Sequence, residues 1–374
     1  MSDPPQDTAP SPNDESERLG LTTGRCVMPA EWGPHRATWV AWPHERSDWP
    51  GKLETVHWCY VDIIRQLASV EPVEVIFESG VSQQRAWGRL EKTGVNLDRV
   101  SAHQFPTDRS WVRDSGGTFV AQRTTPGGAP RLMLVDWRFN AWAKYDNWRH
   151  DDRLPGRIAT VRGVERVVPV RTSSREPVVL EGGSIDVNGA GVALATEQCL
   201  LDETVQPRNP TLGREGLEAA LATYLGVHTV VWLGQGIAGD DTHGHVDDLA
   251  RFVDASTVVV ASESDPTDEN YTPLRDNLRR LRHTRVDGRQ LTVVPIPMPR
   301  PLRFGSSRLP ASYLNFYIAN TLVLVPTFND PSDRHALSLL ADLFDDRHVV
   351  GVHALDLVLG LGTLHCLTLQ EPRV

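Results

Sequence analysis

The chain has 374 residues, 40% of them hydrophobic, so it can bury a large core as one big domain or two ordinary ones. A formal net charge of -10 argues against a nucleic-acid-binding protein and weakly favours a cationic partner. No apolar run approaches the roughly 20 residues of a membrane span, and the N-terminus lacks a signal-peptide pattern. We therefore expect a cytoplasmic protein that binds neither nucleic acid nor membranes.

The first 24 residues are predicted to form a disordered tail. Residues 1–19 contain four prolines and several acids but almost nothing apolar, so burial would not repay the entropy lost on ordering. From Val27 onward the composition is that of a globular protein, and no later stretch resembles a linker. We predict one continuous domain over residues 25–374.

Short apolar runs rich in β-branched residues predict strands along this domain. In chain order they are 73–77, 132–135, 178–180, 192–194, 229–232, 257–261, 291–294, 322–325 and 349–352. Helix-period segments lie between them at 53–68, 213–225, 273–281 and 332–344, the last opened by a Ser-Asp capping signal. The strands outnumber the helices, and no glycine-rich phosphate loop follows the first strand. This pattern disfavours a dinucleotide-binding fold and favours several small mixed sheets around a centre.

Residues 239–248 are the densest cluster of titratable groups in the chain. They read Gly-Asp-Asp-Thr-His-Gly-His-Val-Asp-Asp and follow an apolar run that predicts a strand. If the segment is extended, alternation places most of its titratable side chains on one face, namely Asp241, His243, His245 and Asp247. Burying such a cluster is costly without a partner, so we expect either a metal ion or a charged substrate to bind it.

A zinc site is one interpretation of this segment. The run from His243 to Asp248 resembles the His-x-His-x-Asp-His pattern of zinc hydrolases, but Leu249 stands where the final histidine would be. Zinc would also need ligands from elsewhere, and the remaining histidines lie in unremarkable settings. A structural histidine held by nearby carboxylates is a further alternative.

The chain has four cysteines without paired spacing, and each is expected to be a free thiol: Cys26, Cys59, Cys199 and Cys366. Cys366 lies just after two glycines, which let the backbone turn tightly or approach a ligand. An inert buried thiol is the common alternative. A base or a positive group nearby would instead lower the thiol pKa from its reference of ~8.5 and make it reactive. Cys59 falls on an amphipathic helix and Cys199 in an apolar strand, and both look inert.

Two further carboxylates stand beside glycines. Glu181 ends an apolar run and precedes Gly-Gly, so it is well placed to face a pocket, although a solvated charge at a strand edge is equally common. Asp114 lies in Trp-Val-Arg-Asp-Ser-Gly-Gly, where the neighbouring Arg113 makes a surface ion pair the alternative. Trp111 offers an aromatic face on which a planar cation can stack.

Taken together, these segments resemble the agmatine deiminase family, a branch of the guanidino-group modifying superfamily that also includes the Porphyromonas-type peptidylarginine deiminase. The matching segments occur in the family's order and cover nearly everything outside the tail. They are Met28-Pro-Ala-Glu-Trp32, Ala41-Trp-Pro-His44, Trp111-Val-Arg-Asp114, Leu180-Glu-Gly-Gly-Ser-Ile185, Asp240-Asp-Thr-His-Gly-His-Val-Asp247, Ala311-Ser-Tyr-Leu-Asn-Phe-Tyr-Ile-Ala-Asn320, Val325-Pro-Thr-Phe328 and His365-Cys366.

The resemblance implies an α/β fold, a five-bladed α/β propeller (pentein fold) of small mixed sheets with helices around a central channel. It implies that Cys366 is the nucleophile, that His245 is the acid and base, and that three carboxylates hold the guanidinium nitrogens. The implied catalytic residues are Cys366, His245, Asp247, Glu181 and Asp114, and the implied substrate-binding residues are Trp111, Asp241 and His44. The implied chemistry needs no cofactor and no metal.

The implied reaction is hydrolytic deimination of a small guanidinium substrate through a covalent amidino-cysteine intermediate, most simply agmatine and water giving N-carbamoylputrescine and ammonia. The alternatives are deimination of another guanidino compound, such as a peptidyl or modified arginine, and a non-catalytic propeller that binds a partner. The sequence is also compatible with a homo-oligomer. Asp241 stands where many family members carry a glutamate for the far amine of the substrate. A basic segment holding Arg300, Arg303 and Arg308 could instead contact a carboxylate, which agmatine lacks.

Overall fold

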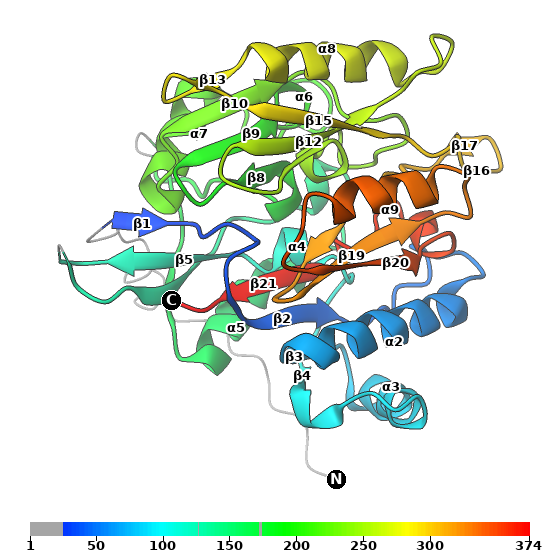
Figure 1. Cartoon of the computed structure of the whole chain (residues 1–374). Coiled ribbons are helices and arrows are strands. Elements are labelled where there is room, and N and C mark those ends of the chain that lie inside the picture. The colour runs from blue at the N-terminus through cyan, green and yellow to red at the C-terminus, as the bar shows by residue number, and fades with distance from the viewer. Residues whose placement is uncertain (1–24, 126, 172–173) are drawn as a thin grey trace.

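The strands of the chain form several small sheets, seen in a computed structural model that describes residues 25–125, 127–171 and 174–374. Within these residues there are five sheets of three or four strands and two additional two-stranded hairpins (Figure 1). The predicted tail, residues 1–24, lies outside the described residues, and the single domain over 25–374 stays a prediction. No helix in the described part of the chain is long and apolar enough to cross a membrane.

One topology recurs in all five sheets. The first strand runs antiparallel to the second, the second runs parallel to the third, and a helix connects the second to the third. Parallel neighbours need such a crossover because a tight turn can join only antiparallel strands. The prediction of small mixed sheets with helices is confirmed.

The bounds of these repeats are as follows. The first sheet joins β21 (Thr368–Pro372), β2 (His35–Ala41), α2 (Leu53–Val70) and β3 (Val73–Phe77), with α3 (Gly80–Lys92) and an outer β4 (Val100–Gln104). The second joins β5 (Thr118–Arg123), β6 (Arg131–Val135), α5 (Leu154–Arg162) and β7 (Glu165–Val167), with an outer β1 (Arg25–Val27). The third joins β8 (Ile185–Val187), β9 (Val192–Thr196), α7 (Gly213–Leu225) and β10 (Thr229–Leu233). The fourth joins β11 (Ala250–Phe252), β12 (Thr257–Ser262), α8 (Tyr271–His283) and β15 (Thr292–Pro297). The fifth joins β18 (Tyr317–Ile318), β19 (Leu322–Thr327), α9 (Asp333–Ala341) and β20 (His348–His353).

The connecting helices pack an apolar face against the sheets and lie at the periphery of the molecule, as Figure 1 shows for α2, α8 and α9. In α2 the buried residues recur at helical spacing, as expected for a helix with one face in the core. They are Val56, Tyr60, Val61, Ile63, Ile64, Leu67 and Ala68. The prediction of helices at 53–68, 213–225 and 273–281 is confirmed.

Two local predictions are wrong, and a third is confirmed only in part. Residues 178–180 form only an isolated bridge, because the side-chain amide of Asn209 bonds both the N–H and the C=O of Val179 where a neighbouring strand would pair. Cys199 lies in the short helix α6 (Glu197–Leu200) and not in a strand. The helix predicted over 332–344 is present but ends at Ala341, and the side chain of Ser332, its N-cap residue, makes no capping hydrogen bond. The Asp333 carboxylate instead accepts hydrogen bonds from the backbone of the preceding loop.

The first sheet joins the two ends of the described chain, since β21 pairs antiparallel with β2. Glu371 of β21 is fully buried and accepts hydrogen bonds from the Trp39 indole at 2.9 Å and from Arg162 Nε of α5 at 2.6 Å. This carboxylate therefore ties the closing strand both to its own sheet and to the helix of the next one.

Replacing Glu371 with Ala is expected to lower the free energy of unfolding by about 3 kcal/mol, because the Trp39 indole and Arg162 Nε both lose their buried acceptor. Glu74 still contacts the Arg162 guanidinium at 3.2 Å. Urea denaturation followed by tryptophan fluorescence measures the change. Arg36→Ala is the matched control: Arg36 contacts the same carboxylate at 3.4 Å but is 53% exposed, so its loss should cost less than about 1 kcal/mol. Equal effects of the two substitutions would contradict this account of the ring closure.

Candidate active site

The segment 239–248 is a compact turn and not the extended strand predicted from its alternation. The Asp240 carboxylate accepts hydrogen bonds from the backbone N–H groups of Thr242, Gly244 and His245 at 2.7–3.0 Å. His243 and Gly244 have φ of 65° and 99°, the left-handed region in which a strand cannot continue. Asp side chains favour such turns because they substitute for backbone acceptors.

This turn sends its titratable side chains in different directions. His243 contacts Asp202 at 2.8 Å, and Asp241 accepts a hydrogen bond from the Tyr145 hydroxyl at 2.6 Å. His245 and Asp247 alone of the four are fully buried. The predicted face of four titratable groups does not form, and with it the His-x-His arrangement of the zinc interpretation is lost.

The predicted catalytic residues all occupy one place in the repeat, the segment just before the first strand of a sheet. Asp114 lies in α4 (Val112–Ser115) before β5, and Glu181 precedes the 3-10 turn η4 (Gly182–Ser184) before β8. His245 and Asp247 belong to the turn around η5 (Val246–Asp248) before β11, and Cys366 precedes β21. The fifth sheet contributes a residue that the sequence did not single out, Asn315 before β18.

These segments bring their side chains to one cluster. The Cys366 sulfur lies 3.6 Å from Asp247 Oδ2, and the Asn315 side-chain amide lies 3.1 Å from the same sulfur. His245 Nδ1 is 3.9 Å from both Asp114 Oδ1 and Asp247 Oδ1. The thiol, the imidazole and the carboxylates therefore meet as predicted from the sequence.

Gly183 stands in the middle of this cluster and shows how tightly it is packed. A Cβ atom at this position would lie 2.6 Å from His245 Nδ1 and 2.9 Å from both Asp114 Oδ1 and Asp247 Oδ2. No L side chain tolerates contacts that short, so only glycine lets this backbone approach the three groups. The Gly183 N–H also donates to Asp114 Oδ1 at 2.9 Å and orients that carboxylate.

Three buried polar atoms of the cluster have no hydrogen-bond partner among the described residues: both ring nitrogens of His245 and Asp247 Oδ1. Buried polar groups without partners are rare because each one forgoes its hydration. His245 approaches its carboxylate neighbours at 3.6–3.9 Å, which is too long for a hydrogen bond. The cluster can therefore still form hydrogen bonds, through these three atoms, with a bound group that carries several N–H bonds.

Glu181 and His245 form the charged pair on one side of the cluster. Arg208 Nε donates to both Glu181 oxygens, at 3.0 and 3.4 Å, and both side chains are fully buried. Burial opposes ionisation of Glu181, but Arg208 and His245 outweigh it and lower the glutamate pKa to about 2. Burial likewise opposes a charged imidazole, yet Asp114, Cys199 and Glu181 raise the pKa of His245 well above its usual value. His245 is therefore able to carry a proton.

Asp247 also contacts a second group of titratable and charged side chains. His365 bridges Asp247 Oδ2 at 2.7 Å and Glu31 Oε2 at 2.8 Å, and Glu31 is paired in turn with Arg113 and Arg251. Although burial favours its neutral form, His365 lowers the pKa of Asp247. Asp247 is thus an anion next to the thiol.

The Cys366 thiol is the neutral member of the cluster. Burial, and then Asp247, Asp248 and Asp114, raise its pKa well above the usual value, against a smaller effect of the Asn315 amide. A cation bound among these carboxylates would cancel their influence and favour the thiolate. A bound positive charge would therefore make the Cys366 thiol more reactive.

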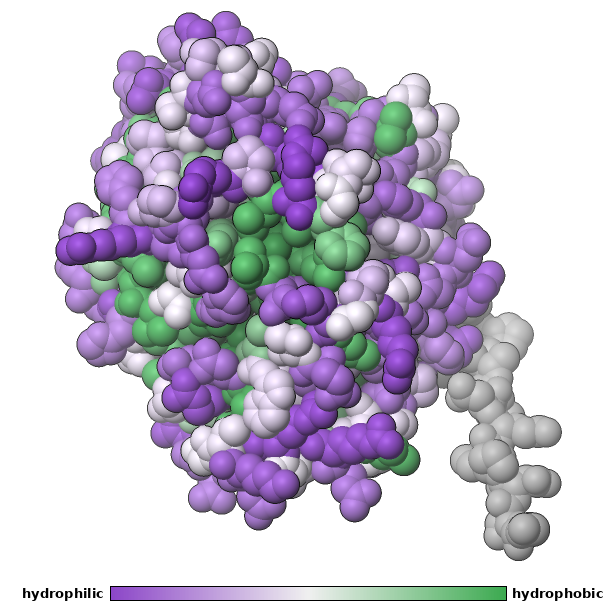
Figure 2. Space-filling model, turned by 90° about the vertical axis from the view of Figure 1, so that its right-hand side faces the viewer, coloured by the Kyte–Doolittle hydropathy of each residue, from purple (hydrophilic) through white to green (hydrophobic). Residues whose placement is uncertain are grey.

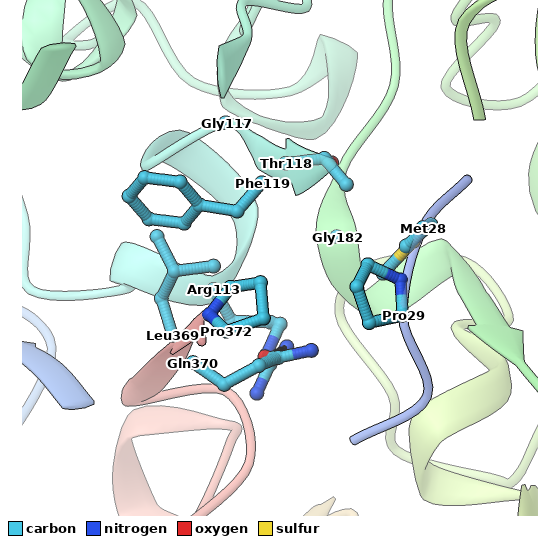
Figure 3. Close-up of a pocket in the computed structure, with 10 residues that line it drawn as sticks. All are labelled: Met28, Pro29, Arg113, Gly117, Thr118, Phe119, Gly182, Leu369, Gln370 and Pro372. Atoms are coloured by element: carbon cyan, nitrogen blue, oxygen red, sulfur yellow. Dashed lines mark hydrogen bonds between the residues drawn. The ribbon is translucent and has the colours of Figure 1, made fainter. Parts of the chain in front are cut away.

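A cavity of about 320 Å³ connects this cluster to the surface. Its apolar wall includes Trp111, Leu309, Leu359 and Leu361, and Phe304 of the hairpin β16 (Arg303–Phe304) and β17 (Ser307–Arg308) stands at its mouth. Figure 2 looks at the side that carries this hairpin and shows an apolar hollow bordered by hydrophilic residues. A second hollow among Met28, Arg113, Gly182 and Gln370 holds only about 10 Å³, room for no more than a water molecule (Figure 3).

Two of the three predicted substrate-binding residues line the cavity, and one does not. Trp111 and Asp241 belong to its wall. Trp111 is fixed by a hydrogen bond from its indole to Asp48 Oδ2 at 3.1 Å and by its contact with the Trp49 ring. His44 bonds the Thr107 hydroxyl at 2.9 Å and is absent from the lining, so the structure does not bring it to the cluster.

Among the described residues one group could hold a metal ion, Glu181, Cys199 and His245, whose ligand atoms lie within 4.8 Å of one another. The Arg208 guanidinium already occupies the Glu181 carboxylate, so a divalent cation there would face a fixed positive charge. This donor set fits a metal poorly.

Several residues of the site were missed by the sequence reasoning. Asn315, His365 and Glu31 lie inside segments that carried the family resemblance, but nothing in their local pattern predicts contact with Cys366 or Asp247. Arg208 follows no motif at all, and its only signal is the need of a buried carboxylate for a cation.

Known proteins of one family match this chain over most of its length. A sequence profile of the Porphyromonas-type peptidyl-arginine deiminase family matches residues 27–372. The agmatine deiminase of Ectopseudomonas mendocina (strain ymp) is 36% identical over 369 residues, covering 92% of this chain and 95% of that protein. The solved structure of the Enterococcus faecalis agmatine deiminase matches with a TM-score of 0.84 at 32% identity, covering 95% and 99% of the two chains. That of C. jejuni agmatine deiminase with substrate bound gives 0.81 at 27% identity, covering 93% and 96%.

The repeated sheets and the buried cluster at their meeting point define a guanidino-modifying enzyme of the pentein fold. The chain belongs to the Porphyromonas-type peptidyl-arginine deiminase family, and the resemblance found in the sequence is confirmed.

Alkylation of Cys366 by iodoacetamide is expected to rise with pH through pH 9 without a plateau, because the neighbouring carboxylates raise the thiol pKa. Asp247→Asn should speed alkylation at pH 8 by about tenfold, the effect of lowering that pKa by one unit. Intact-protein mass spectrometry measures the rate, with Cys366→Ala as the background and Asp265→Asn, an exposed carboxylate, as the control. A plateau below pH 8 would mean that the thiolate forms without a bound cation.

Proposed function

We propose that this protein catalyses the hydrolytic deimination of agmatine, giving N-carbamoylputrescine and ammonia. The main observation behind this proposal is the contact of the Cys366 thiol with Asp247 at 3.6 Å. Beside it lies the His245 ring, whose nitrogens have no hydrogen-bond partner among the described residues. Agmatine deiminases at 34–36% identity over 92% of the chain support the choice of substrate.

Binding begins with the guanidinium group, which is planar, always charged and rich in N–H donors. We assign Asp114 and Asp247 as the acceptors of hydrogen bonds from its nitrogens. Asp247 Oδ1 has no hydrogen-bond partner among the described residues and can accept one. Paired, charge-assisted hydrogen bonds of this kind are stronger than neutral ones. Glu181 is committed to Arg208 and lies 3.6 Å from His245 Nε2, so we assign it to orienting the imidazole and not primarily to the guanidinium.

The bound guanidinium then activates the nucleophile. Its positive charge offsets the carboxylates that raise the pKa of Cys366, and the thiol proton passes to solvent through the cavity. The sulfur attacks the guanidinium carbon and forms a tetrahedral adduct. As a C–N bond breaks, His245 donates a proton to the leaving nitrogen, which departs as ammonia and leaves an amidino group bound to sulfur.

Hydrolysis reverses the roles. His245, now without its proton, removes one from a water molecule that attacks the amidino carbon. Collapse of the second tetrahedral adduct breaks the C–S bond, and the hydroxyl proton of the adduct passes to the departing sulfur, which restores the Cys366 thiol and leaves the ureido product. One water is consumed and one ammonia released for each guanidinium, with no change of oxidation state.

Deimination of another guanidino compound is the second candidate, because the cavity wall is mostly apolar beyond the cluster and would accept other stems. Assembly as a homo-oligomer and a cytoplasmic location stay predictions.

Cys366→Ala should reduce ureido product formation from agmatine by at least about 10⁴-fold, since no other thiol lines the cavity. Cys59→Ala, a half-buried thiol on α2, is the matched control and should keep full activity. Colorimetric detection of the ureido product, with free arginine and a peptidyl-arginine as comparison substrates, separates the candidates. Turnover that survives Cys366→Ala, or that a chelator abolishes, would overturn the thiol mechanism.

A further inference from the structure

The wall of the cavity near its mouth contains a carboxylate, Asp241, that is already neutralised within the protein. Lys144 Nζ forms an ion pair with one of its oxygens, and the Tyr145 hydroxyl donates to the other at 2.6 Å. Asp241 is 17% exposed and lines the cavity, whereas Lys144 is 40% exposed and approaches from outside.

The other carboxylate of this outer wall is also paired. Asp48 accepts hydrogen bonds from Arg109 and from the Trp111 indole. Of the carboxylates that line the cavity, only Asp114 in the deep cluster has no lysine or arginine partner among the described residues. The charges of Asp48 and Asp241 are therefore offset within the protein, whereas no lysine or arginine of the described residues offsets that of Asp114.

Three arginines that the sequence analysis considered as partners for a substrate carboxylate are directed elsewhere. Arg300 contacts Asp330 at 2.8 Å, Arg303 contacts Glu269 at 3.6 Å and Arg308 contacts Asp268 at 2.8 Å. None of the three lines the cavity. Arg109 does line the cavity, but its guanidinium is paired with Asp48. Lys144 is therefore the lysine or arginine that acts on Asp241.

The backbone holds Lys144 and Tyr145 in place by a strained turn. Ala141, Trp142 and Ala143 have φ of 49°, 58° and 54°, three consecutive non-glycine residues in the left-handed region. Each such residue costs roughly 1–2 kcal/mol, so the surrounding contacts must enforce the turn. The Trp142 indole donates to Asp114 Oδ2 at 2.9 Å, and the residues that follow reach Asp241.

We propose that Lys144 is a specificity-determining residue, which competes with the terminal ammonium of the substrate for Asp241. This inference rests on the proposed deiminase function. The ammonium group of a substrate can bind Asp241 only if it shares this carboxylate with Lys144 or displaces the Lys144 side chain. A substrate with an uncharged tail does not bind Asp241 and loses no affinity to this competition. The Tyr145 side chain is less free to move away from Asp241, because its ring centroid lies 4.2 Å from Arg109 Cζ and its ring contacts that of Trp142. Lys144 therefore weakens selection for amine-tailed guanidines.

The test is the ratio of kcat/KM for agmatine to kcat/KM for n-butylguanidine, which has the same stem but no amine. Lys144→Met should raise this ratio about tenfold, mainly through a lower KM for agmatine. Lys144→Arg keeps the charge and is the matched control, with an unchanged ratio. In Asp241→Asn the same Lys144→Met substitution should have no effect on the ratio, because the two residues act through one interaction.

A ratio that does not move in Lys144→Met, in a protein that turns over both guanidines and keeps its melting temperature, would overturn the inference and leave the deiminase function intact. A ratio that rises equally in the Asp241→Asn background would also overturn it, since the effect would not pass through Asp241. Failure of the wild-type protein to release ammonia from any guanidine would instead contradict the proposed function.

Discussion

Compensation of buried negative charge is the constraint on which the rest of the molecule depends. Carboxylates from several sheets meet at one point, and a desolvated anion is tolerated only beside a cation. The chain supplies fully buried guanidinium groups for this purpose, Arg208 on Glu181 and Arg251 on Asp186 and Glu31. These pairs hold Glu181, Asp186 and Glu31 in place, so the positions of the proposed catalytic side chains depend on charge balance as well as on apolar packing.

The compensation is incomplete in the cluster around Cys366, which is where we propose that the reaction occurs. Asp114 and Asp247 have no arginine or lysine partner among the described residues, and between them lies His245 with unbonded ring nitrogens. A guanidinium substrate supplies the missing positive charge and, by the same charge, makes the Cys366 thiolate accessible. Selectivity for a cation and activation of the nucleophile thus have one electrostatic origin, which also spares the free enzyme a reactive thiolate.

The sequence predicted the fold well where its signal is local. Buried strands such as β3 and β19 are short, mainly apolar runs with several β-branched residues, and α2 and α7 show clear helical spacing. It failed where hydrogen bonds from side chains to the backbone decide the outcome. The run 178–180 has strand composition, but Asn209 takes its hydrogen bonds, and alternation in 239–248 is overridden by the Asp240 side chain. The site followed the same rule: family motifs located Cys366 and His245, whereas Arg208 and His365 act through partners that no spacing reveals.

The left-handed turn at Ala141–Ala143 has a consequence for how this protein can change. Glycine at Ala141 or Ala143 would relieve the strain and keep the turn, because glycine adopts left-handed backbone freely. A change that lets the turn unwind would instead move Trp142 away from Asp114, and Lys144 and Tyr145 away from Asp241. One short turn therefore couples the geometry of the two carboxylates, and it can gain stability without losing that coupling only through glycine.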